Sequence, residues 1–285
     1  MGGLMSTHRL GKLVAACSMA IVGLLCGPLS GSTQETGRSG PLRHLELPGE
    51  SLEIAGRPGF VLLPSDELRQ TPQPWVMYAP TLPAYPDQHE AWMHERFLAA
   101  GIAVAGIDAG EAYGSPPGQE LMTALHDELV HRRGFAEKPC LLGRSRGGLW
   151  VSSWAIAHPD RVAGIAGIYP VFDLRTYPGL EKAAPAYGMS PAELEASLAI
   201  HNPIARIDGL ARAAIPICII HGDQDTVVPL AENSAALAER YRALGKDDRV
   251  ELIVVQGQGH NFWEGFFRSV PLVEFVIGQA RAGAR

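Results

Sequence analysis

Runs of apolar residues alternate with helix-like stretches along the chain from residue 74 onward. The runs are apolar at nearly every position, which is typical of strands in a parallel sheet covered on both faces. The stretches between them are longer and mixed in polarity; in 88–100, for example, Trp92, Phe97 and Leu98 are among the apolar positions. The pattern predicts strands at 74–80, 102–108, 139–143, 162–169, 216–222 and 250–256, and helices at 88–100, 118–133, 146–158, 230–244 and 262–281.

Two parts of the chain depart from this alternation. Three short strand candidates, 43–47, 51–54 and 59–63, are separated by Gly and Pro and are predicted to form an antiparallel edge. Residues 172–213 are irregular and helical by turns. The order predicts an α/β protein with the α/β-hydrolase fold: a mostly parallel central sheet with antiparallel N-terminal strands, helices on both faces, and a small cap insertion at about 172–213.

The length, hydrophobic content and net charge of the chain limit the kinds of protein that it can be. The chain has 285 residues, of which 46% are hydrophobic, and this is enough to bury the core of one α/β domain, predicted at 43–285. The formal net charge is -6, and no basic stripe stands out. Nucleic acid is therefore not an expected partner. The sequence does not indicate an oligomeric state.

The first residues have a different pattern. Basic side chains within 8–12 precede an apolar run, 13–29, that contains Gly and Pro and is followed by small residues. This pattern predicts a secretory signal peptide at 1–32, followed by a flexible lead-in at 33–42. A membrane anchor is the alternative, and a lipoprotein signal at Cys17 is a third. We expect an exported protein, periplasmic or secreted, with no stable membrane association after cleavage.

No metal or organic cofactor is expected. Cys140 and Cys218 lie in apolar strand-like runs without a CxxC partner, so we expect buried thiols. His89 and His94 are five residues apart, whereas a zinc-binding helix needs a spacing of four to place both on one face.

The most informative motif is Gly-Arg-Ser-Arg-Gly at 143–147. It fits G-x-S-x-G and lies between a predicted strand and a predicted helix, which is the context of a nucleophile elbow. Such an elbow places the serine on a strained turn, and the glycines relieve crowding by the neighbouring strand and helix. The pattern predicts Ser145 as a catalytic nucleophile, which then needs a base and an orienting acid.

Two later loops supply the expected partners. The loop His-Gly-Asp-Gln-Asp-Thr-Val-Val-Pro at 221–229 resembles the acid loop of serine hydrolases related to prolyl oligopeptidase and dienelactone hydrolase. This resemblance, which covers 74–281, implies Asp225 as the acid and His260, in Gly-Gln-Gly-His, as the base. Asp223 and Asp173 remain alternatives for the acid. His221 is expected to be structural.

The resemblance also implies an oxyanion hole. One donor is the backbone N–H of Arg146, the residue after the nucleophile. The other comes from the loop after the strand 74–80, where Pro80 and Pro83 have no N–H. Thr81 and Leu82 remain, and the resemblance favours Leu82. The His-Gly pair common in this loop of the family is absent here.

The arginines beside the serine have two interpretations. A cation at a helix start opposes the helix dipole, so the Arg146 side chain needs a compensating group. Glu111 could form a structural pair with it, or Arg146 could hold a carboxylate of the substrate. Glucuronoyl esterases resemble this chain at the Ser-Arg pair, but the rest of their motif is absent and that activity is not assigned. Arg144 is predicted to be a surface or rim charge.

Arg146, Glu111, Tyr113 and Trp263 are the candidate substrate-binding residues, because loops at the carboxyl ends of parallel strands bind ligands in such sheets. Core packing is the alternative for each aromatic residue. The sequence thus predicts an exported serine esterase of the carboxylesterase type that acts on a small-molecule ester through an acyl-enzyme. A serine peptidase of the prolyl oligopeptidase type is the alternative, and a non-catalytic binding homologue is a third.

Overall fold

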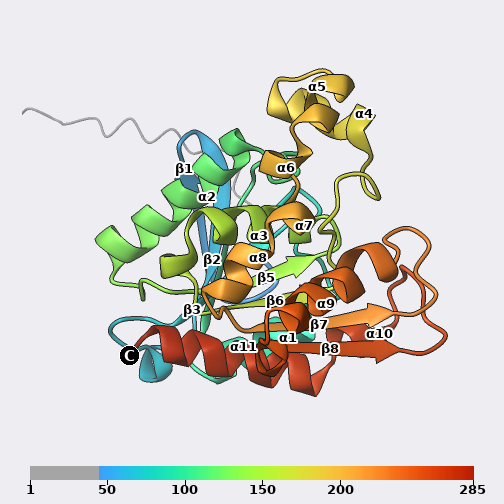
Figure 1. Cartoon of the computed structure of the whole chain (residues 1–285). Helices are drawn as coiled ribbons and strands as arrows, with labels where there is room; N and C mark the ends of the chain where they lie inside the picture. Colours follow the sequence, from blue (N-terminus) through green and yellow to red (C-terminus); the bar gives the residue numbers. More distant parts are fainter. Residues whose placement is uncertain (1–44) are drawn as a thin grey trace, which may run out of the picture. The chain divides into compact units, whose positions relative to one another are not determined.

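The computed structural model describes residues 45–285, and Figure 1 shows their course through an eight-stranded sheet. The predicted signal peptide and flexible lead-in, residues 1–42, lie outside the described residues. The strand order is β1-β2-β4-β3-β5-β6-β7-β8. The strands are β1 (Gly49–Ile54), β2 (Arg57–Leu62), β3 (Trp75–Ala79), β4 (Ala103–Ile107), β5 (Cys140–Arg144), β6 (Gly164–Ile168), β7 (Ile217–Gly222) and β8 (Val250–Val255).

The pairing directions confirm the predicted α/β-hydrolase arrangement. β2 pairs antiparallel with both β1 and β4, and the other neighbouring strands are parallel. The predicted strand 43–47 is wrong where the structure describes it, because residues 45–47 form no strand and β1 begins at Gly49. Pro48 explains the shift, since it has no N–H to donate to a neighbouring strand.

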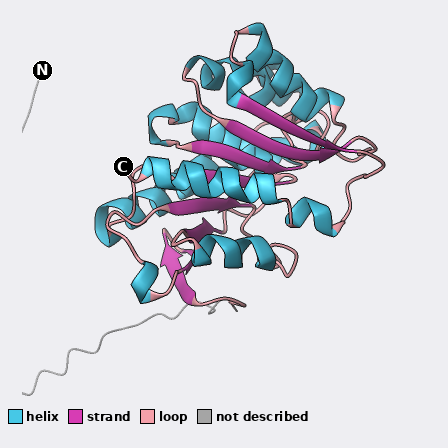
Figure 2. Cartoon of the chain, turned by 90° about the horizontal axis from the view of Figure 1, so that it is seen from below, coloured by secondary structure: helices cyan, strands magenta, loops and turns pink. Residues whose placement is uncertain are grey.

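Helices cover both faces of the sheet, as Figure 2 shows. α1 and α11 pack on one face, and α2, α3 and α9 pack on the other. The helices are α1 (Ala91–Ala99), α2 (Pro116–Asp127), α3 (Gly147–Ala157), α4 (Leu180–Ala183), α5 (Pro191–Ala196), α6 (Leu198–His201), α7 (Pro203–Arg206), α8 (Asp208–Arg212), α9 (Ala236–Ala243), α10 (Glu264–Phe267) and α11 (Val270–Gly283).

The hydrophobic core has one half on each face of the sheet. Successive side chains of a strand point to opposite faces. In β3, Trp75 and Met77 therefore pack with α2 and α3, whereas Val76 and Tyr78 pack in the half that includes residues of α1 and α11. The central strands are buried on both sides, which explains why they are apolar at nearly every position.

The segment predicted as a cap, 172–213, contains α4 to α8, none longer than six residues. Such short helices have few internal hydrogen bonds. Side-chain amides fix the start of the segment instead: the backbone N–H groups of Phe172 and Asp173 donate to Asn233 Oδ1, and that of Leu174 donates to Asn202 Oδ1.

The helix predicted at 262–281 is two helices. α10 ends at Phe267, and a new helix begins after Ser269, whose hydroxyl accepts a hydrogen bond from the Leu272 N–H. Pro271 in the first turn suits a helix start and not a helix interior. Cys140 and Cys218 are free, buried thiols, as expected. Among residues 45–285, no helix combines the length and apolar character needed to cross a bilayer.

Candidate active site

Ser145 lies in the turn between β5 and α3 with φ of 51°. This left-handed conformation is strained for a residue with a side chain. The Ser145 N–H donates to the carbonyl of Ile168, and its own carbonyl accepts from the Val171 N–H, both at 2.9 Å. A Cβ on Gly143 would lie 2.8 Å from a Val151 methyl, and one on Gly147 would overlap the carbonyl oxygen of Ala79. The two glycines of the motif therefore permit the turn.

Three side chains from separate loops form one hydrogen-bonded chain. Ser145 Oγ lies 2.8 Å from His260 Nε2, and His260 Nδ1 lies 2.7 Å from Asp225 Oδ2. Oδ1 of Asp225 accepts the N–H groups of Val227 and Val228 at 3.0 and 2.8 Å. The structure thus brings together the three residues named from the sequence, in the geometry in which a carboxylate orients an imidazole toward a hydroxyl.

The environment of Asp225 keeps its carboxyl group ionised. Burial acts to raise its pKa, but hydrogen bonds from His221, His260 and the Val228 N–H outweigh it and hold the pKa well below the usual range. An ionised Asp225 accepts from Nδ1–H of His260, which leaves Nε2 as the acceptor facing the Ser145 hydroxyl. His221 is fully buried, and its ring also contacts Ser234 Oγ and the Val228 carbonyl.

The alternative acids have other partners. Asp223 accepts the Gly257 N–H at 2.6 Å. Asp173 accepts from Asn202 Nδ2 at 2.7 Å and from the Arg175 N–H at 2.9 Å. Both carboxylates therefore stabilise loops, and in residues 45–285 only Asp225 is hydrogen-bonded to His260.

Residues 120–270 match the prolyl oligopeptidase family, and this match includes Ser145, Asp225 and His260. The chain belongs to the prolyl oligopeptidase family. This confirms the resemblance seen in the sequence and makes the protein a serine hydrolase. No curated protein sequence matches the chain.

Solved structures support the fold. TT1662 from Thermus thermophilus is 17% identical, with a TM-score of 0.60 over 82% of this chain and 99% of that one. Est1E from Butyrivibrio proteoclasticus is 16% identical, with a TM-score of 0.60 over 81% and 98%. A puromycin-hydrolyzing peptidase from Mycobacterium tuberculosis is 18% identical, with a TM-score of 0.59 over 82% of this chain and 40% of that chain. This chain therefore spans about two fifths of the length of that peptidase.

A cavity of about 180 Å³ opens onto Ser145. Tyr169 was not among the residues singled out from the sequence, although it directly follows β6, at the carboxyl end of a parallel strand where ligand-binding residues gather. Tyr177 was missed because it lies in the irregular cap segment. The cavity is lined by Pro80, Tyr85, Arg144, Ser145, Arg146, Tyr169, Tyr177, Val227, His260, Asn261 and Phe262.

The predicted oxyanion donors differ in availability. In the part of the chain that the structure describes, no backbone carbonyl accepts the Arg146 N–H. The Leu82 N–H donates to the Tyr85 carbonyl at 3.2 Å, and the Tyr85 N–H donates back to the Leu82 carbonyl at 2.9 Å. The structure therefore contradicts Leu82 as an oxyanion donor, because its N–H is used in a tight turn.

Arg144 is buried, so the expectation of a surface or rim charge is wrong. Its side chain is 5% exposed and bonds Glu90 at 2.7 Å and Asp87 at 3.0 Å. Tyr78 also donates to Glu90, at 2.6 Å. Burial acts to lower the pKa of Arg144, but the charge of Glu90 outweighs it and raises the pKa further, so the group stays charged. The rings of Tyr85, Phe262 and Phe267 lie 4.9 to 5.2 Å from the guanidinium carbon.

Arg146 forms the predicted pair with Glu111, at 3.1 Å between Nη2 and Oε1. The other two candidate binding residues do not line the cavity. Trp263 is 43% exposed and packs edge-on against Phe266. Tyr113 contacts the ring of Trp150, and its carbonyl accepts the Tyr187 hydroxyl. Of the four candidates, Arg146 alone lines the cavity.

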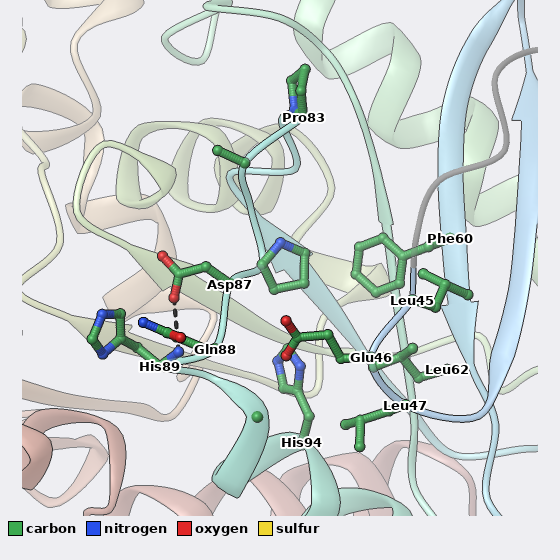
Figure 3. Close-up of a pocket in the computed structure, with 13 residues that line it drawn as sticks. Leu45, Glu46, Leu47, Phe60, Leu62, Pro83, Asp87, Gln88, His89 and His94 are labelled. Carbon is green, nitrogen blue, oxygen red and sulfur yellow. Dashed lines mark hydrogen bonds between the residues drawn. The ribbon is translucent and has the colours of Figure 1, made fainter.

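A second cavity, of about 380 Å³, is lined in part by the segment 83–91 and by none of the three triad residues (Figure 3). Asp87 belongs to its wall and accepts the His89 N–H. The ring of His89 stacks on Phe262, which lines the first cavity, at 4.5 Å between centroids. His94, in the wall of the second cavity, is 2% exposed. Burial lowers its pKa to about 3, and its Nε2 is without a hydrogen-bond partner among the described residues.

Residues 45–285 contain no group of three or more His, Cys, Asp or Glu side chains placed to hold a metal ion.

Proposed function

We propose that this serine hydrolase cleaves carboxylic esters through an acyl-enzyme intermediate. The observation that carries the proposal is the chain of hydrogen bonds from Ser145 through His260 to Asp225, at 2.8 and 2.7 Å. Such a chain activates a hydroxyl that is otherwise a weak nucleophile.

The reaction proceeds in two halves. Ser145 Oγ attacks the ester carbonyl carbon while His260 Nε2 takes the hydroxyl proton. The carbonyl oxygen becomes an oxyanion that the Arg146 N–H stabilises. The bond to the leaving alcohol then breaks as His260 returns the proton to the alcohol oxygen. Water attacks the acyl-enzyme with His260 again as the base, and the carboxylic acid and free Ser145 are released.

The size of the cavity favours small esters. It holds about 180 Å³ and is bordered by Tyr177 from the cap segment and by Phe262. A serine peptidase is the second candidate, because the chain belongs to the prolyl oligopeptidase family and its fold is similar to that of a puromycin-hydrolyzing peptidase. This chain matches only about two fifths of that peptidase. We further propose export of the protein, on the basic, apolar and small-residue pattern before residue 33.

The test is hydrolysis of p-nitrophenyl acetate by the protein and by Ser145→Ala, together with labelling of both by a fluorophosphonate. We expect turnover and labelling in the first and neither in the second. Turnover that survives in Ser145→Ala would contradict the proposal. A peptide p-nitroanilide measured beside the acetate separates the two candidates, because faster cleavage of the anilide would favour the peptidase.

A further inference from the structure

The cavity at Ser145 presents cationic groups and no acidic ones. Arg144 and Arg146 belong to its lining, and no Asp or Glu of the described chain does. The carboxylates that bond these arginines, Asp87, Glu90 and Glu111, lie outside the cavity wall. A molecule bound in this cavity therefore contacts the two arginines and not the carboxylates that pair with them.

Arg146 has spare capacity to bind an anion. Its pair with Glu111 uses Nη2, and the Glu111 side chain is 47% exposed. Exposed pairs of this kind contribute about 0–1 kcal/mol, so they are easily exchanged. Nε of Arg146 is buried and has no hydrogen-bond acceptor among the described residues. A buried donor without a partner is unfavourable, and a ligand oxygen that reached Nε as the side chain turned from Glu111 would satisfy it.

Arg144 is a fixed part of the cavity wall, and Asp87 and Glu90 compensate its charge. Two carboxylates and three aromatic rings hold its guanidinium, so it cannot turn away from the cavity. The rest of the wall is largely aromatic, with Tyr85, Tyr169 and Phe262. Charge pairs are stronger beside apolar walls of this kind than in open water.

We propose that the preferred esters carry a carboxylate close to the scissile bond, bound by the Arg146 guanidinium. This inference rests on the proposed ester hydrolysis and names its substrate class. The carboxylate belongs either to the acyl group or to the alcohol, and both use the same chemistry at Arg146. A substrate with an ammonium group at this place is disfavoured.

Two pairs of matched esters test the inference. Mono-4-nitrophenyl terephthalate and 4-nitrophenyl 4-carbamoylbenzoate differ in a carboxylate or an amide on the acyl side. 4-Acetoxybenzoate and 4-acetoxybenzamide differ in the same way on the leaving-group side. kcat/KM is measured for each with the unchanged protein, Arg146→Gln, Arg146→Lys and Arg132→Gln. Arg146→Gln keeps the backbone N–H, and Arg132 is the control because its side chain is 78% exposed and pairs with Glu128 at the surface.

We expect the acid to exceed its amide at least tenfold in one pair, and that pair identifies the side that carries the carboxylate. Arg146→Gln should abolish the preference for the acid over its amide, Arg146→Lys should restore part of it, and Arg132→Gln should retain it. The preference should also shrink as NaCl rises from 20 to 500 mM.

Equal rates for acid and amide in both pairs would overturn the inference, and so would an equal loss for both in Arg146→Gln. If neither pair turns over, protection of Ser145 from the fluorophosphonate decides: 4-carbamoylbenzoate should protect better than terephthalamide, and equal protection would overturn the inference. The proposed function fails separately, through turnover or labelling that does not depend on Ser145.

Discussion

The ring of Tyr169 packs against the imidazole of His260, with 4.3 Å between the ring centroids. Tyr169 directly follows β6, has a φ of 36°, and donates its N–H to the Ile220 carbonyl at 2.8 Å. Phe266 meets the same ring edge-on at 5.0 Å. A residue held in an unfavourable backbone conformation thus limits how the imidazole can turn away from Ser145.

Loss of this ring should impair catalysis more than loss of its hydroxyl. An aromatic pair contributes about 0.5–1.5 kcal/mol, and the upper end of this range corresponds to roughly tenfold in rate. We expect Tyr169→Ala to lower kcat for p-nitrophenyl acetate about tenfold and to change the pH profile of kcat, while Tyr169→Phe stays within about threefold. Circular dichroism of both variants checks the fold. Equal losses in both variants would contradict a positioning role for the ring.

Asp225 and Asp223 are a matched pair for testing the orienting acid. Asp225→Asn keeps the shape but favours the wrong His260 tautomer, and a change of this kind lowers kcat by about 10⁴ in a known triad. Asp223 bonds only a loop amide, so Asp223→Asn should keep kcat within about threefold. The measurement is kcat for p-nitrophenyl acetate at pH 7.5. Similar losses in the two variants would argue against Asp225 as the orienting acid.

Removal of the buried guanidinium should destabilise the protein. Arg144→Met leaves Glu90, whose side chain is fully buried, without its ionic partner. Breaking a buried pair in this way costs about 3–5 kcal/mol in free energy of unfolding. Arg144→Met combined with Glu90→Gln should recover part of the loss, because no unpaired carboxylate remains. Urea unfolding measures both, with Arg132→Met as the exposed control, and a double variant no more stable than the single one would refute this account.

His94 should make the protein sensitive to mild acid. Its pKa is near 6.5 in an unfolded chain and about 3 in the folded one, because burial disfavours the charged ring. Between these values the unfolded chain binds more protons, so stability falls as the pH is lowered through this window and is fully present above about 6.5. The contribution lost at pH 5 is about 2 kcal/mol.

His94→Phe should remove this loss, since phenylalanine fills a similar volume and does not titrate. The measurement is urea unfolding at pH 7.5 and pH 5.0 for the unchanged protein, His94→Phe and His131→Phe. His131 is the control because its side chain is 65% exposed. The same difference between the two pH values in all three proteins would exclude His94 as its source. Asp225 acts in the same direction mainly at lower pH, because its carboxyl takes up protons in the unfolded chain around its ordinary pKa of about 3.9.

Features that depend on local sequence could be predicted. The apolar strands, the glycines around Ser145 and the loops that follow β7 and β8 are set by rules that act over a few residues. The resemblance of these two loops to those of a known family implied Asp225 and His260, and the structure places both side chains in the hydrogen-bonded chain to Ser145.

Features that depend on what covers a side chain could not be predicted in the same way. The sequence predicted an exposed Arg144, because none of the residues next to it in the chain indicates that the segment with Asp87 and Glu90 folds over it. The turn at Leu82, in contrast, could have been predicted from the adjacent residues. Pro83 at the second position of a four-residue turn favours the hydrogen bonds that close between Leu82 and Tyr85.

The first residues of the cap segment are held in place by hydrogen bonds, and this affects how a substrate can reach Ser145. A lid opens only where a few backbone dihedral angles are free to change. The N–H groups of the three consecutive residues 172–174 are all bound by asparagine oxygens, so a hinge there would have to break each of these bonds. Val227 and Phe262, which line the cavity and are 45% and 55% exposed, form the open rim instead. We therefore expect the space between these two side chains, and not a movement of the cap segment, to limit the size of the group that reaches Ser145.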